Sequence, residues 1–325
     1  MGITVLFGYG GDSTLSKNTG GFLLTEENEQ TLVRDFPEYN FIFGNSMDHT
    51  AETYAQADVM IGHFDHEHIK KATRLKWLQA TTSGTDRYQG AVDPSKVIVT
   101  NSWNVFSECM AEHTFALMIA YSRSILLYHL SQRREERQRH PIPIDLFDST
   151  VGIVGLGGIG LATARRCKAF GMRVLATKRN AVEKPDFVDE LLYGTDKLDY
   201  ILKESDFVVL SMPLTPETKD LISTRELSIM KPTACLVNVA RGAVVDTKAL
   251  TEALEAKTIA AAYLDCTNPE PLPAGHPLWQ MPNVLITPHV ANMSPSSNRF
   301  RFEFYHKNLS RYLKGETLFN VVKEL

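Results

Sequence analysis

The sequence predicts an α/β protein with parallel sheets, and three observations lead to this prediction. Short runs rich in β-branched residues alternate with helical stretches along most of the chain. One of these runs leads directly into a glycine-rich loop. The chain has 325 residues, of which 43% are hydrophobic, so it is long enough for two domains with cores of their own. Strands that alternate with helices favour parallel sheets covered by helices on both faces.

Apolar runs bounded by turn-forming or polar residues are the expected strands. They are Ile3–Phe7, Val151–Val154, Arg173–Thr177, Phe207–Met212, Leu236–Val239 and Val284–Thr287. Between residues 132 and 150 a charged stretch gives way to Pro141 and Pro143 and then to an apolar run. We interpret this as a helix end and a connector, followed by the first strand of a nucleotide domain. Its charges are typical of a solvated face, with contact to substrate or partner as the alternative.

Charge and cysteine usage narrow the class of protein. The formal net charge of −4 gives no reason to expect nucleic acid or an anionic membrane as a partner. The four cysteines are far apart and form no CxxC pair, which is typical of reduced thiols in a cytosolic protein. No basic region precedes a long apolar stretch at the N-terminus, and the apolar run at 115–127 contains Arg123 and is too short to span a bilayer. We therefore expect a cytoplasmic protein.

The segment VGIVGLGGIG (151–160) has the glycine pattern of a dinucleotide-binding loop. It follows an apolar strand and leads into a helical stretch that Gly171 closes, and this order makes the pattern specific. Gly155 is expected to form the tight turn, Gly157 to let the backbone approach a pyrophosphate, and Gly160 to let the helix pack on the strand. The first helical residues, Gly158 and Ile159, are expected to offer free N–H groups to the anion.

Two cations stand where such chains usually carry an acidic residue for the adenosine ribose. The second strand of the nucleotide domain, RVLAT, is followed by Lys178 and Arg179. A carboxylate at this place accepts a hydrogen bond from a ribose 2′-hydroxyl, whereas guanidinium and ammonium groups suit a 2′-phosphate. The pattern predicts NADP as the cofactor, with NAD as second choice. The alternative is that both are surface cations and that cofactor use is mixed.

Three further motifs follow apolar strands in the second half of the chain. LVNVARG (236–242) brings Arg241, AAYLDCTNPEPLP (261–273) brings Asp265 and Glu270, and VLITPHV (284–290) brings His289. The carboxyl ends of parallel strands line the ligand crevice of an open sheet, so these side chains are expected near a bound nicotinamide.

The motifs together resemble the D-isomer-specific 2-hydroxyacid dehydrogenase family over almost the whole chain. The segments that carry the resemblance are VGIVGLGGIG, DFVVLSMPLTPETKDLI, MKPTACLVNVARGAVVD, LDCTNPEPLP and NVLITPHVA. By this resemblance Arg241, Glu270 and His289 would form the catalytic triad, and Asp265 would contact the nicotinamide side. Further cofactor contacts are expected at Pro213, Thr218 and Ala240.

The resemblance also implies the domain layout and the assembly. A Rossmann cofactor domain, residues 101–291, would be inserted into a flavodoxin-like substrate domain formed by residues 1–100 and 292–325, both with parallel sheets. The active site would lie in the cleft, with domain closure on cofactor binding. The segment QATTSGTD (79–86) would hold the substrate carboxylate through backbone N–H groups near Ser83 and Gly84. The helix at 104–120 would link the domains and contribute to a homodimer interface.

The chemistry of these residue types agrees with a hydride transfer. Reduction of a ketone leaves charge on oxygen, so a positioned acid must deliver a proton. Imidazole titrates near neutral pH, which makes His289 the natural acid in reduction and base in oxidation. Glu270 would orient the ring and favour its charged form. The fork of Arg241 can bind the substrate carboxylate and polarise its carbonyl.

We therefore expect an NADP(H)-dependent D-2-hydroxyacid dehydrogenase that reduces small 2-keto acids. Glyoxylate, hydroxypyruvate, pyruvate-like and branched 2-keto acids are all candidates, and the D stereochemistry comes from the resemblance alone. One alternative is an NAD-dependent dehydrogenase of the phosphoglycerate or phosphite type. The other is a non-enzymatic, NAD(P)H-sensing scaffold like the transcriptional corepressors that share this fold, which steady turnover would argue against.

Other patterns are weaker. GYGG (8–11) follows a strand but lacks a third glycine, so we interpret it as a loop of the other domain. GHFDHEH (62–68) is interpreted as a solvated loop, with pocket contact by Phe64 or His63, or a metal site, as alternatives. No metal is expected. Cys266 is expected to be a small buried residue rather than a redox switch, and Ser294 to support His289 or contact the substrate.

Overall fold

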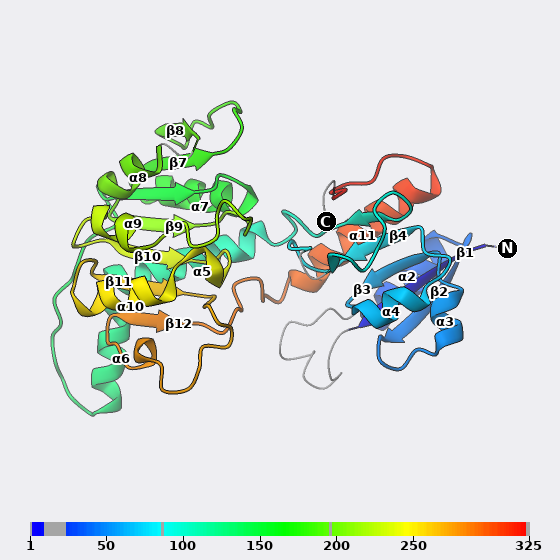
Figure 1. Ribbon diagram of the computed structural model, residues 1–325, viewed down its shortest axis with the longest axis horizontal. Coiled ribbons are helices and arrows are strands. Elements are labelled where there is room, and N and C mark those ends of the chain that lie inside the picture. Colours follow the sequence, from blue (N-terminus) through cyan, green and yellow to red (C-terminus); the bar gives the residue numbers. More distant parts are fainter. Residues whose placement is uncertain (1, 10–23, 86–87, 195–196, 323–325) are drawn as a thin grey trace. The chain divides into compact units, whose positions relative to one another are not determined.

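The computed structural model describes residues 2–9, 24–85, 88–194 and 197–322 (Figure 1). By its internal contacts the chain divides into unit 1, Met1–Phe106 with Met293–Leu325, and unit 2, Ser107–Asn292. The sequence places the corresponding boundaries at 100/101 and 291/292. No helix in the described ranges is both long and apolar enough to cross a membrane.

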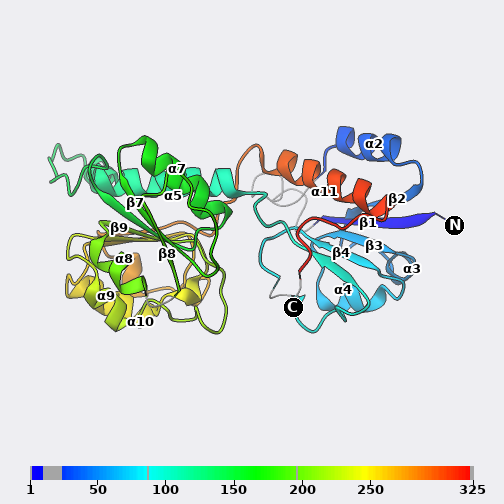
Figure 2. The same cartoon turned by 90° about the horizontal axis from the view of Figure 1, so that it is seen from above.

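Unit 1 contains a five-stranded sheet in the order β2-β1-β3-β4-β5, with all pairs parallel. This is the strand order of flavodoxin-like folds. Its strands are β1 (Ile3–Tyr9), β2 (Tyr39–Asn45), β3 (Val59–Gly62), β4 (Trp77–Ala80) and β5 (Ile98–Thr100). Its helices are α2 (Glu26–Asp35), α3 (Ala51–Ala55), α4 (His66–Lys71) and α11 (Ser297–Leu313). Figure 2 shows α2 and α11 on one face of this sheet and α4 on the other.

Strand β1 illustrates why both faces of this sheet are apolar. Successive side chains of a strand point to opposite faces. Val5 and Phe7 pack in one core cluster with Tyr305 and Leu309 of α11. Leu6, between them, packs in the other cluster with residues of α3 and α4. A strand covered on both faces therefore has a continuous apolar sequence instead of an alternating one.

Unit 2 contains a seven-stranded parallel sheet in the order β12-β11-β10-β9-β6-β7-β8. The strands are β6 (Thr150–Val154), β7 (Arg173–Lys178), β8 (Glu190–Tyr193), β9 (Phe207–Leu210), β10 (Cys235–Asn238), β11 (Ala261–Leu264) and β12 (Val284–Ile286). From β6 the chain first builds β7 and β8 on one side, then β9 to β12 on the other. The order reverses between β6 and β9, the place where Rossmann folds bind dinucleotides.

Helices cover both faces of this sheet. They are α5 (Ser107–Ser122), α6 (Ile125–Arg133), α7 (Gly158–Ala169), α8 (Leu198–Glu204), α9 (Thr224–Ile229) and α10 (Thr247–Glu255), with short 3₁₀ turns η3 (Gly242–Val244) and η4 (Pro277–Trp279). Residues of α5 and α7 belong to one core cluster, and residues of α8, α9 and α10 to the other. Figure 2 shows these two groups on opposite faces. The prediction of an α/β fold with two parallel sheets is confirmed.

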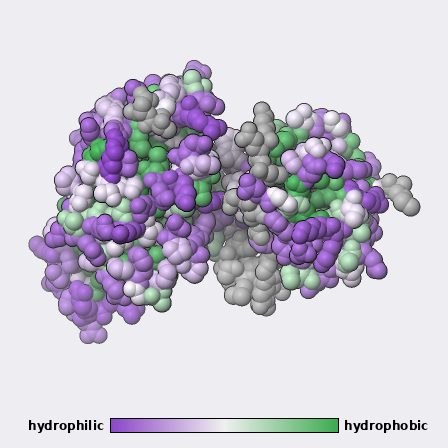
Figure 3. All heavy atoms as spheres, in the orientation of Figure 1, coloured by the Kyte–Doolittle hydropathy of each residue, from purple (hydrophilic) through white to green (hydrophobic). Residues whose placement is uncertain are grey.

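The charged segment that begins in the last turn of α6 and continues beyond it is solvated. Residues 132–139 are all exposed. Figure 3 shows a hydrophilic surface at this end of unit 2, where α6 lies in Figure 1.

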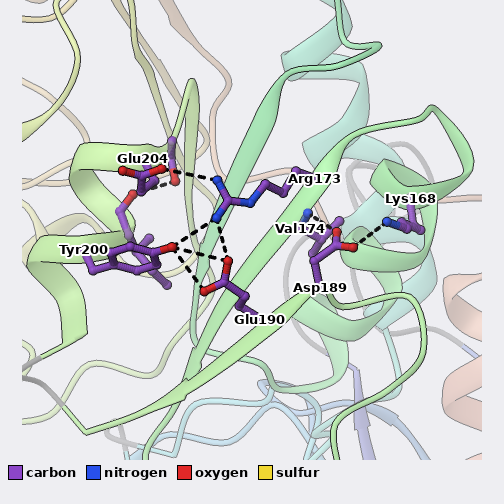
Figure 4. Close-up of polar contacts among 9 residues, drawn as sticks. Lys168, Arg173, Val174, Asp189, Glu190, Tyr200 and Glu204 are labelled. Carbon is purple, nitrogen blue, oxygen red and sulfur yellow. Dashed lines mark hydrogen bonds and ion pairs between the residues drawn. The ribbon is translucent and has the colours of Figure 1, made fainter.

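An aspartate just before a strand caps the neighbouring strand at three places. Asp58 accepts from the backbone N–H of Thr4 at 3.0 Å, Asp206 from Thr150 at 2.9 Å and Asp189 from Val174 at 2.8 Å. Each carboxylate also pairs with a cation, namely Arg74, Lys231 and Lys168 in the same order. Figure 4 shows the third case beside Arg173, which joins β7 to Glu190 of β8 and to Glu204 and Tyr200 of α8. These contacts fix where adjacent parallel strands begin.

Candidate active site

The predicted site residues of unit 2 lie in the loops that leave the carboxyl edge of its sheet. The glycine loop follows β6, Lys178 ends β7, and Pro213 and Thr218 follow β9. Arg241 follows β10, Asp265 and Glu270 follow β11, and His289 follows β12. Since all these strands are parallel, their carboxyl ends lie at one edge.

The glycine loop has the shape that an approaching phosphate requires. Gly155 has φ +100°, and a Cβ there would lie 2.8 Å from the backbone nitrogen of Met212. A Cβ on Gly160 would lie 2.5 Å from the carbonyl oxygen of Gly155, so only glycine permits this packing of α7. A Cβ on Gly157, by contrast, would meet nothing within 4 Å. The backbone at Gly157, the N-cap of α7, therefore borders open space, where a pyrophosphate could approach the start of this helix.

Lys178 and Arg179 have different environments. The Lys178 ammonium is half-buried and donates to the carbonyl oxygen of Leu156, in the glycine loop, at 2.8 Å. Arg179 is exposed. The pKa of Glu217 is lowered, first by a hydrogen bond with Thr215 and, as a smaller cause, by the charge of Arg179. Lys178 thus holds the loop, while the Arg179 guanidinium lies near the segment that follows β9.

That segment is closed by its own hydrogen bonds. The Thr218 hydroxyl donates to the carbonyl oxygen of Pro213 at 2.8 Å and accepts from the backbone N–H of Thr215 at 2.7 Å. These bonds fix a turn at the end of β9, beside the glycine loop after β6.

Asn238, the last residue of β10, holds the backbone around Arg241. Its buried side chain accepts from the backbone N–H of Ala240 at 3.0 Å and donates to the carbonyl oxygen of Arg241 at 3.0 Å. The Arg241 guanidinium donates to the carbonyl oxygen of Ala240 at 2.9 Å. A Cβ on the next residue, Gly242, would lie 1.8 Å from the carbonyl oxygen of Thr267, so this glycine permits the β10 and β11 loops to touch.

His289 and Glu270 form a direct pair. The distance from His289 Nδ1 to Glu270 Oε1 is 2.6 Å, and each side chain is 42% exposed. An ionised carboxylate only accepts hydrogen bonds, so Nδ1 carries the proton and donates it. Nε2 is then the ring nitrogen that is left for a ligand. The peptide bonds Asn268–Pro269 and Glu270–Pro271, on either side of this carboxylate, are both cis.

Asp265 lies beneath the His289 loop and is only 2% exposed. One carboxylate oxygen accepts from the Thr287 hydroxyl at 2.6 Å and the Val290 N–H at 2.9 Å, and the other from the Ala291 N–H at 2.9 Å. Its backbone oxygen accepts from the N–H of His289 at 2.8 Å. This carboxylate therefore holds the turn in which His289 lies.

Sequence reasoning missed Asn238 and Thr287 as members of the site. Each lies within three residues of a predicted side chain, Arg241 or His289, inside a motif already singled out. A buried amide or hydroxyl at a strand end was the available signal, because such groups need hydrogen-bond partners.

The predicted substrate-loop residues Ser83 and Gly84 belong to unit 1, in the loop after β4. Asn101 donates to the carbonyl oxygen of Ser83 at 2.8 Å, and Thr82 to that of Gly84 at 2.8 Å. Ser294, also in unit 1, donates its N–H to the Ser297 hydroxyl. The end of the predicted loop, Asp86, lies outside the described residues, as do Gly10 and Gly11 of GYGG.

Within the described ranges, the structure has no group of three His, Cys, Asp or Glu side chains that could hold a metal ion. In the segment 62–68, for which a metal site was one of the alternatives, Asp65 caps α4 and His68 stacks on Tyr54. Cys266 is buried, and burial raises the pKa of its thiol.

Comparison with known proteins identifies similar sequences over the larger part of the chain. Residues 115–291 match the family model described as D-isomer specific 2-hydroxyacid dehydrogenase, NAD binding domain. A glyoxylate reductase of Thermococcus gammatolerans is 40% identical over 228 residues, 68% of this chain and 67% of the relative. One of Pyrococcus furiosus is 38% identical over 264 residues, 78% of this chain and 77% of the relative.

Solved structures match over almost the full length. A D-isomer specific 2-hydroxyacid dehydrogenase family protein of Aeromonas salmonicida has a TM-score of 0.83 at 27% identity, covering 99% of both chains. A D-isomer specific 2-hydroxyacid dehydrogenase of Xanthobacter autotrophicus, in complex with NADPH and MES, has a TM-score of 0.81 at 28% identity, covering 99% of this chain and 98% of that one. This chain belongs to the D-isomer specific 2-hydroxyacid dehydrogenase family, whose members are NAD(P)-dependent oxidoreductases acting on a CH–OH group.

Proposed function

We propose that this protein is an NADP(H)-dependent D-2-hydroxyacid dehydrogenase that reduces small 2-keto acids, with His289 as the acid. The observation that carries the proposal is the 2.6 Å pair of His289 with Glu270, on loops at the carboxyl edge that also bears the glycine loop. The relatives named glyoxylate reductase favour a short substrate side chain.

His289 would manage the proton. Because Nδ1 donates to Glu270, the free Nε2 can give a proton to the oxygen that gains charge as the ketone is reduced, and can take it back in oxidation. The carboxylate of Glu270 stabilises the imidazolium form and fixes the ring orientation. When bound, the nicotinamide cofactor supplies the hydride in reduction and accepts it in oxidation.

Arg241 would bind and orient the 2-keto acid. Its guanidinium can engage a carboxylate and a carbonyl oxygen together, which fixes the plane of the substrate and polarises the C=O group. The clamp that Asn238 makes on the backbone of Arg241 supports this role, because catalysis needs a preset geometry. Backbone N–H groups at Ser83 and Gly84 are proposed as further donors to the carboxylate.

The proposed cofactor is NADP in preference to NAD. Gly155, Gly157 and Gly160, with the N-terminus of α7 at Gly158 and Ile159, would hold the pyrophosphate. Arg179, exposed beyond β7, would pair with a 2′-phosphate, and Lys178 would brace the loop beside it. Pro213 and Thr218 would lie along the cofactor, with Ala240 and Asp265 on its nicotinamide side.

We also propose a homodimer that works in the cytoplasm. Apolar side chains exposed on unit 2, among them Phe147 at 69% and Phe170 at 52%, favour burial against a second copy. The four cysteines are all buried, which favours a reducing compartment. Light scattering during gel filtration measures the oligomeric state; a monomeric mass would contradict the dimer.

The test of the function is the initial rate of NADPH oxidation, and separately of NADH oxidation, with a panel of 2-keto acids. The panel runs from glyoxylate through hydroxypyruvate and pyruvate to phenylpyruvate and branched acids. We expect rapid consumption of NADPH with a small 2-keto acid and a lower kcat/KM with NADH. Turnover with NADH alone would overturn the cofactor proposal and keep the reaction. No turnover with either cofactor would overturn the reductase and favour the scaffold.

A further inference from the structure

We propose that His113, in the middle of α5, is a positioning residue for the His289 loop. It would act through Thr287 and Asp265 without touching the substrate. His113 Nε2 lies 3.0 Å from the Thr287 hydroxyl oxygen and 3.5 Å from the nearer Asp265 carboxylate oxygen. The inference rests on the proposed function only in taking His289 as the acid.

The direction of the hydrogen bonds can be worked out from the groups involved. The Thr287 hydroxyl has one proton, and it donates it to the ionised carboxylate of Asp265 at 2.6 Å. Its oxygen can then only accept from His113, so Nε2 of His113 carries a proton. The bonds thus run from His113 to Thr287 to Asp265.

Asp265, which accepts the last bond of this chain, is also hydrogen-bonded to the backbone of the His289 loop. Its two carboxylate oxygens accept from the backbone N–H groups of Val290 and Ala291, and its carbonyl oxygen from that of His289. His289 has φ +55°, a left-handed backbone conformation that residues other than glycine rarely adopt. Such a backbone persists only where surrounding contacts determine it.

His113 is anchored on a helix that packs against the sheet of unit 2. The His113 side chain is 22% exposed, and Thr114, Leu117 and Met118 of the same helix are buried. Helix α5 has 16 residues and packs against β10 and β11, the strands that lead into the Arg241 and Glu270 loops. The donor is therefore carried by a helix packed on the sheet, and the buried carboxylate of Asp265 keeps its hydrogen-bond partners.

The expected consequence of losing this donor is a misplaced His289 in a folded protein. A displacement of about 1 Å at a reacting group costs on the order of 100-fold in rate. In metal sites, loss of a residue that orients a ligand costs about 10- to 100-fold in affinity or activity, and we expect an effect of similar size here. His113→Phe keeps the bulk and removes the donor. His113→Gln places an amide nitrogen near the position of Nε2 and keeps it.

Two readouts test the proposal on the full-length protein. We expect His113→Phe to lower kcat about 10- to 100-fold while leaving the KM for cofactor within about twofold, and His113→Gln to recover kcat to within about threefold. Hydrogen exchange followed by mass spectrometry should show faster exchange in the peptide over 287–291 for His113→Phe and unchanged exchange for His113→Gln. His129→Phe, an exposed histidine of α6, is the matched control and should change neither readout.

A second pair of variants keeps the test decisive if His113→Phe does not fold. Thr287→Val removes the hydroxyl that His113 contacts, and Thr287→Ser retains it, so only the first should lower kcat and speed exchange. Unchanged exchange at 287–291 in His113→Phe or in Thr287→Val overturns the proposal, and so does a His113→Gln protein as impaired as His113→Phe. If the unmodified protein turns over no 2-keto acid, the proposed function fails, while the exchange data still decide the role of His113.

Discussion

At the scale of single residues, the backbone around Arg241 and around His289 is held by hydrogen bonds to a buried polar side chain at a strand end. Asn238, 1% exposed, holds the backbone of Arg241, and Asp265, 2% exposed, holds that of His289. The side chains that would meet the substrate are more exposed than the groups that hold them. A site must be accessible to its ligand and must also have a fixed geometry. Buried hydrogen bonds provide the fixed geometry.

Substitutions of Glu270 and His289 should lower kcat to different extents. Glu270→Gln keeps the size and an acceptor but removes the charge that stabilises the imidazolium, so kcat should fall by about 10- to 100-fold. His289→Asn removes the acid and should lower kcat further, with cofactor affinity unchanged in both variants. Steady-state rates and fluorescence titration with NADPH measure these quantities. A Glu270→Gln enzyme with kcat within twofold of the parent would show that the charge is not used.

Substitutions at Lys178 and at Arg179 should have different effects on cofactor binding. Arg179 is exposed, so Arg179→Ala should weaken 2′,5′-ADP about 10-fold or more and leave 5′-AMP unchanged. Lys178 donates to Leu156 in the glycine loop, so Lys178→Met should weaken both ligands by similar factors. Calorimetric titration gives the two dissociation constants. Selective loss of 2′,5′-ADP in Lys178→Met, with none in Arg179→Ala, would reverse the assignment.

At the scale of elements, the sequence predicted buried strands better than strands at the edges. β1, β6, β7, β9 and β10 in the sheet interiors and β12 at an edge follow from the apolar runs. The other three edge strands, β2, β5 and β8, were not among these runs, and neither were the short interior strands β3 and β4. Most residues of β2 and β8 are only half-buried. An edge strand packs less apolar surface, so its sequence has a weaker hydrophobic signal.

Helix α10 supplies a stability prediction that depends on pH. Asp246 caps it, accepting from the N–H groups of Lys248 and Ala249 and from the Ser223 hydroxyl. The hydrogen bond from Ala249 is the largest cause that lowers the pKa of Asp246 below its ordinary 3.8. A carboxyl whose pKa is lowered by folding stabilises the fold above its ordinary pKa, and this contribution is lost as pH falls through the lowered value.

Asp246→Ala should therefore cost about 1 kcal/mol of unfolding free energy near neutral pH. The difference from the parent should shrink as the pH falls below the ordinary carboxyl pKa of 3.8 and through the lowered pKa of Asp246. Asp246→Asn retains a capping oxygen that does not titrate, so its deficit should be smaller and should not follow this trend. Urea unfolding over the pH series checks both. A deficit that is constant with pH in Asp246→Ala would argue against the ionised cap.

At the scale of the whole molecule, the chain leaves unit 1 after Phe106 and returns to it at Met293. The returning helix α11 completes a core, because Tyr305 and Leu309, both fully buried, pack with Val5, Phe7 and Trp77. Unit 2 has clusters of its own on the two faces of its sheet. Unit 1 is therefore assembled from segments almost 200 residues apart in the sequence.

Separate cores predict separate responses to core mutations. Leu309→Ala should lower the unfolding free energy of unit 1 by about 2–5 kcal/mol, and Ile201→Ala, fully buried in unit 2, should lower that of unit 2 by a similar amount. Hydrogen exchange over a urea series, followed in β3 and in β9, reports on the two units separately. Equal loss of protection in β3 and β9 on Leu309→Ala would mean that the chain unfolds as one cooperative unit.

The sequence by itself determined the fold class, the glycine loop and the family. Each of these depends on local patterns: apolar runs that form buried strands, glycines at fixed spacing between a strand and a helix, and motifs in a fixed order. They can be recognised without knowing which distant residues meet.

Only the tertiary structure decided which polar groups hold the proposed catalytic residues. The contact of His113 with Asp265 joins residues 152 positions apart, and neither the 3.6-residue nor the 2-residue period relates them. The same holds for the hydrogen bond from Lys178 to the carbonyl oxygen of Leu156. Because of this bond, Lys178 holds the glycine loop, while its neighbour Arg179 is exposed. Hydrogen bonds depend on distances of about 3 Å between atoms, and side-chain packing in the folded chain sets these distances.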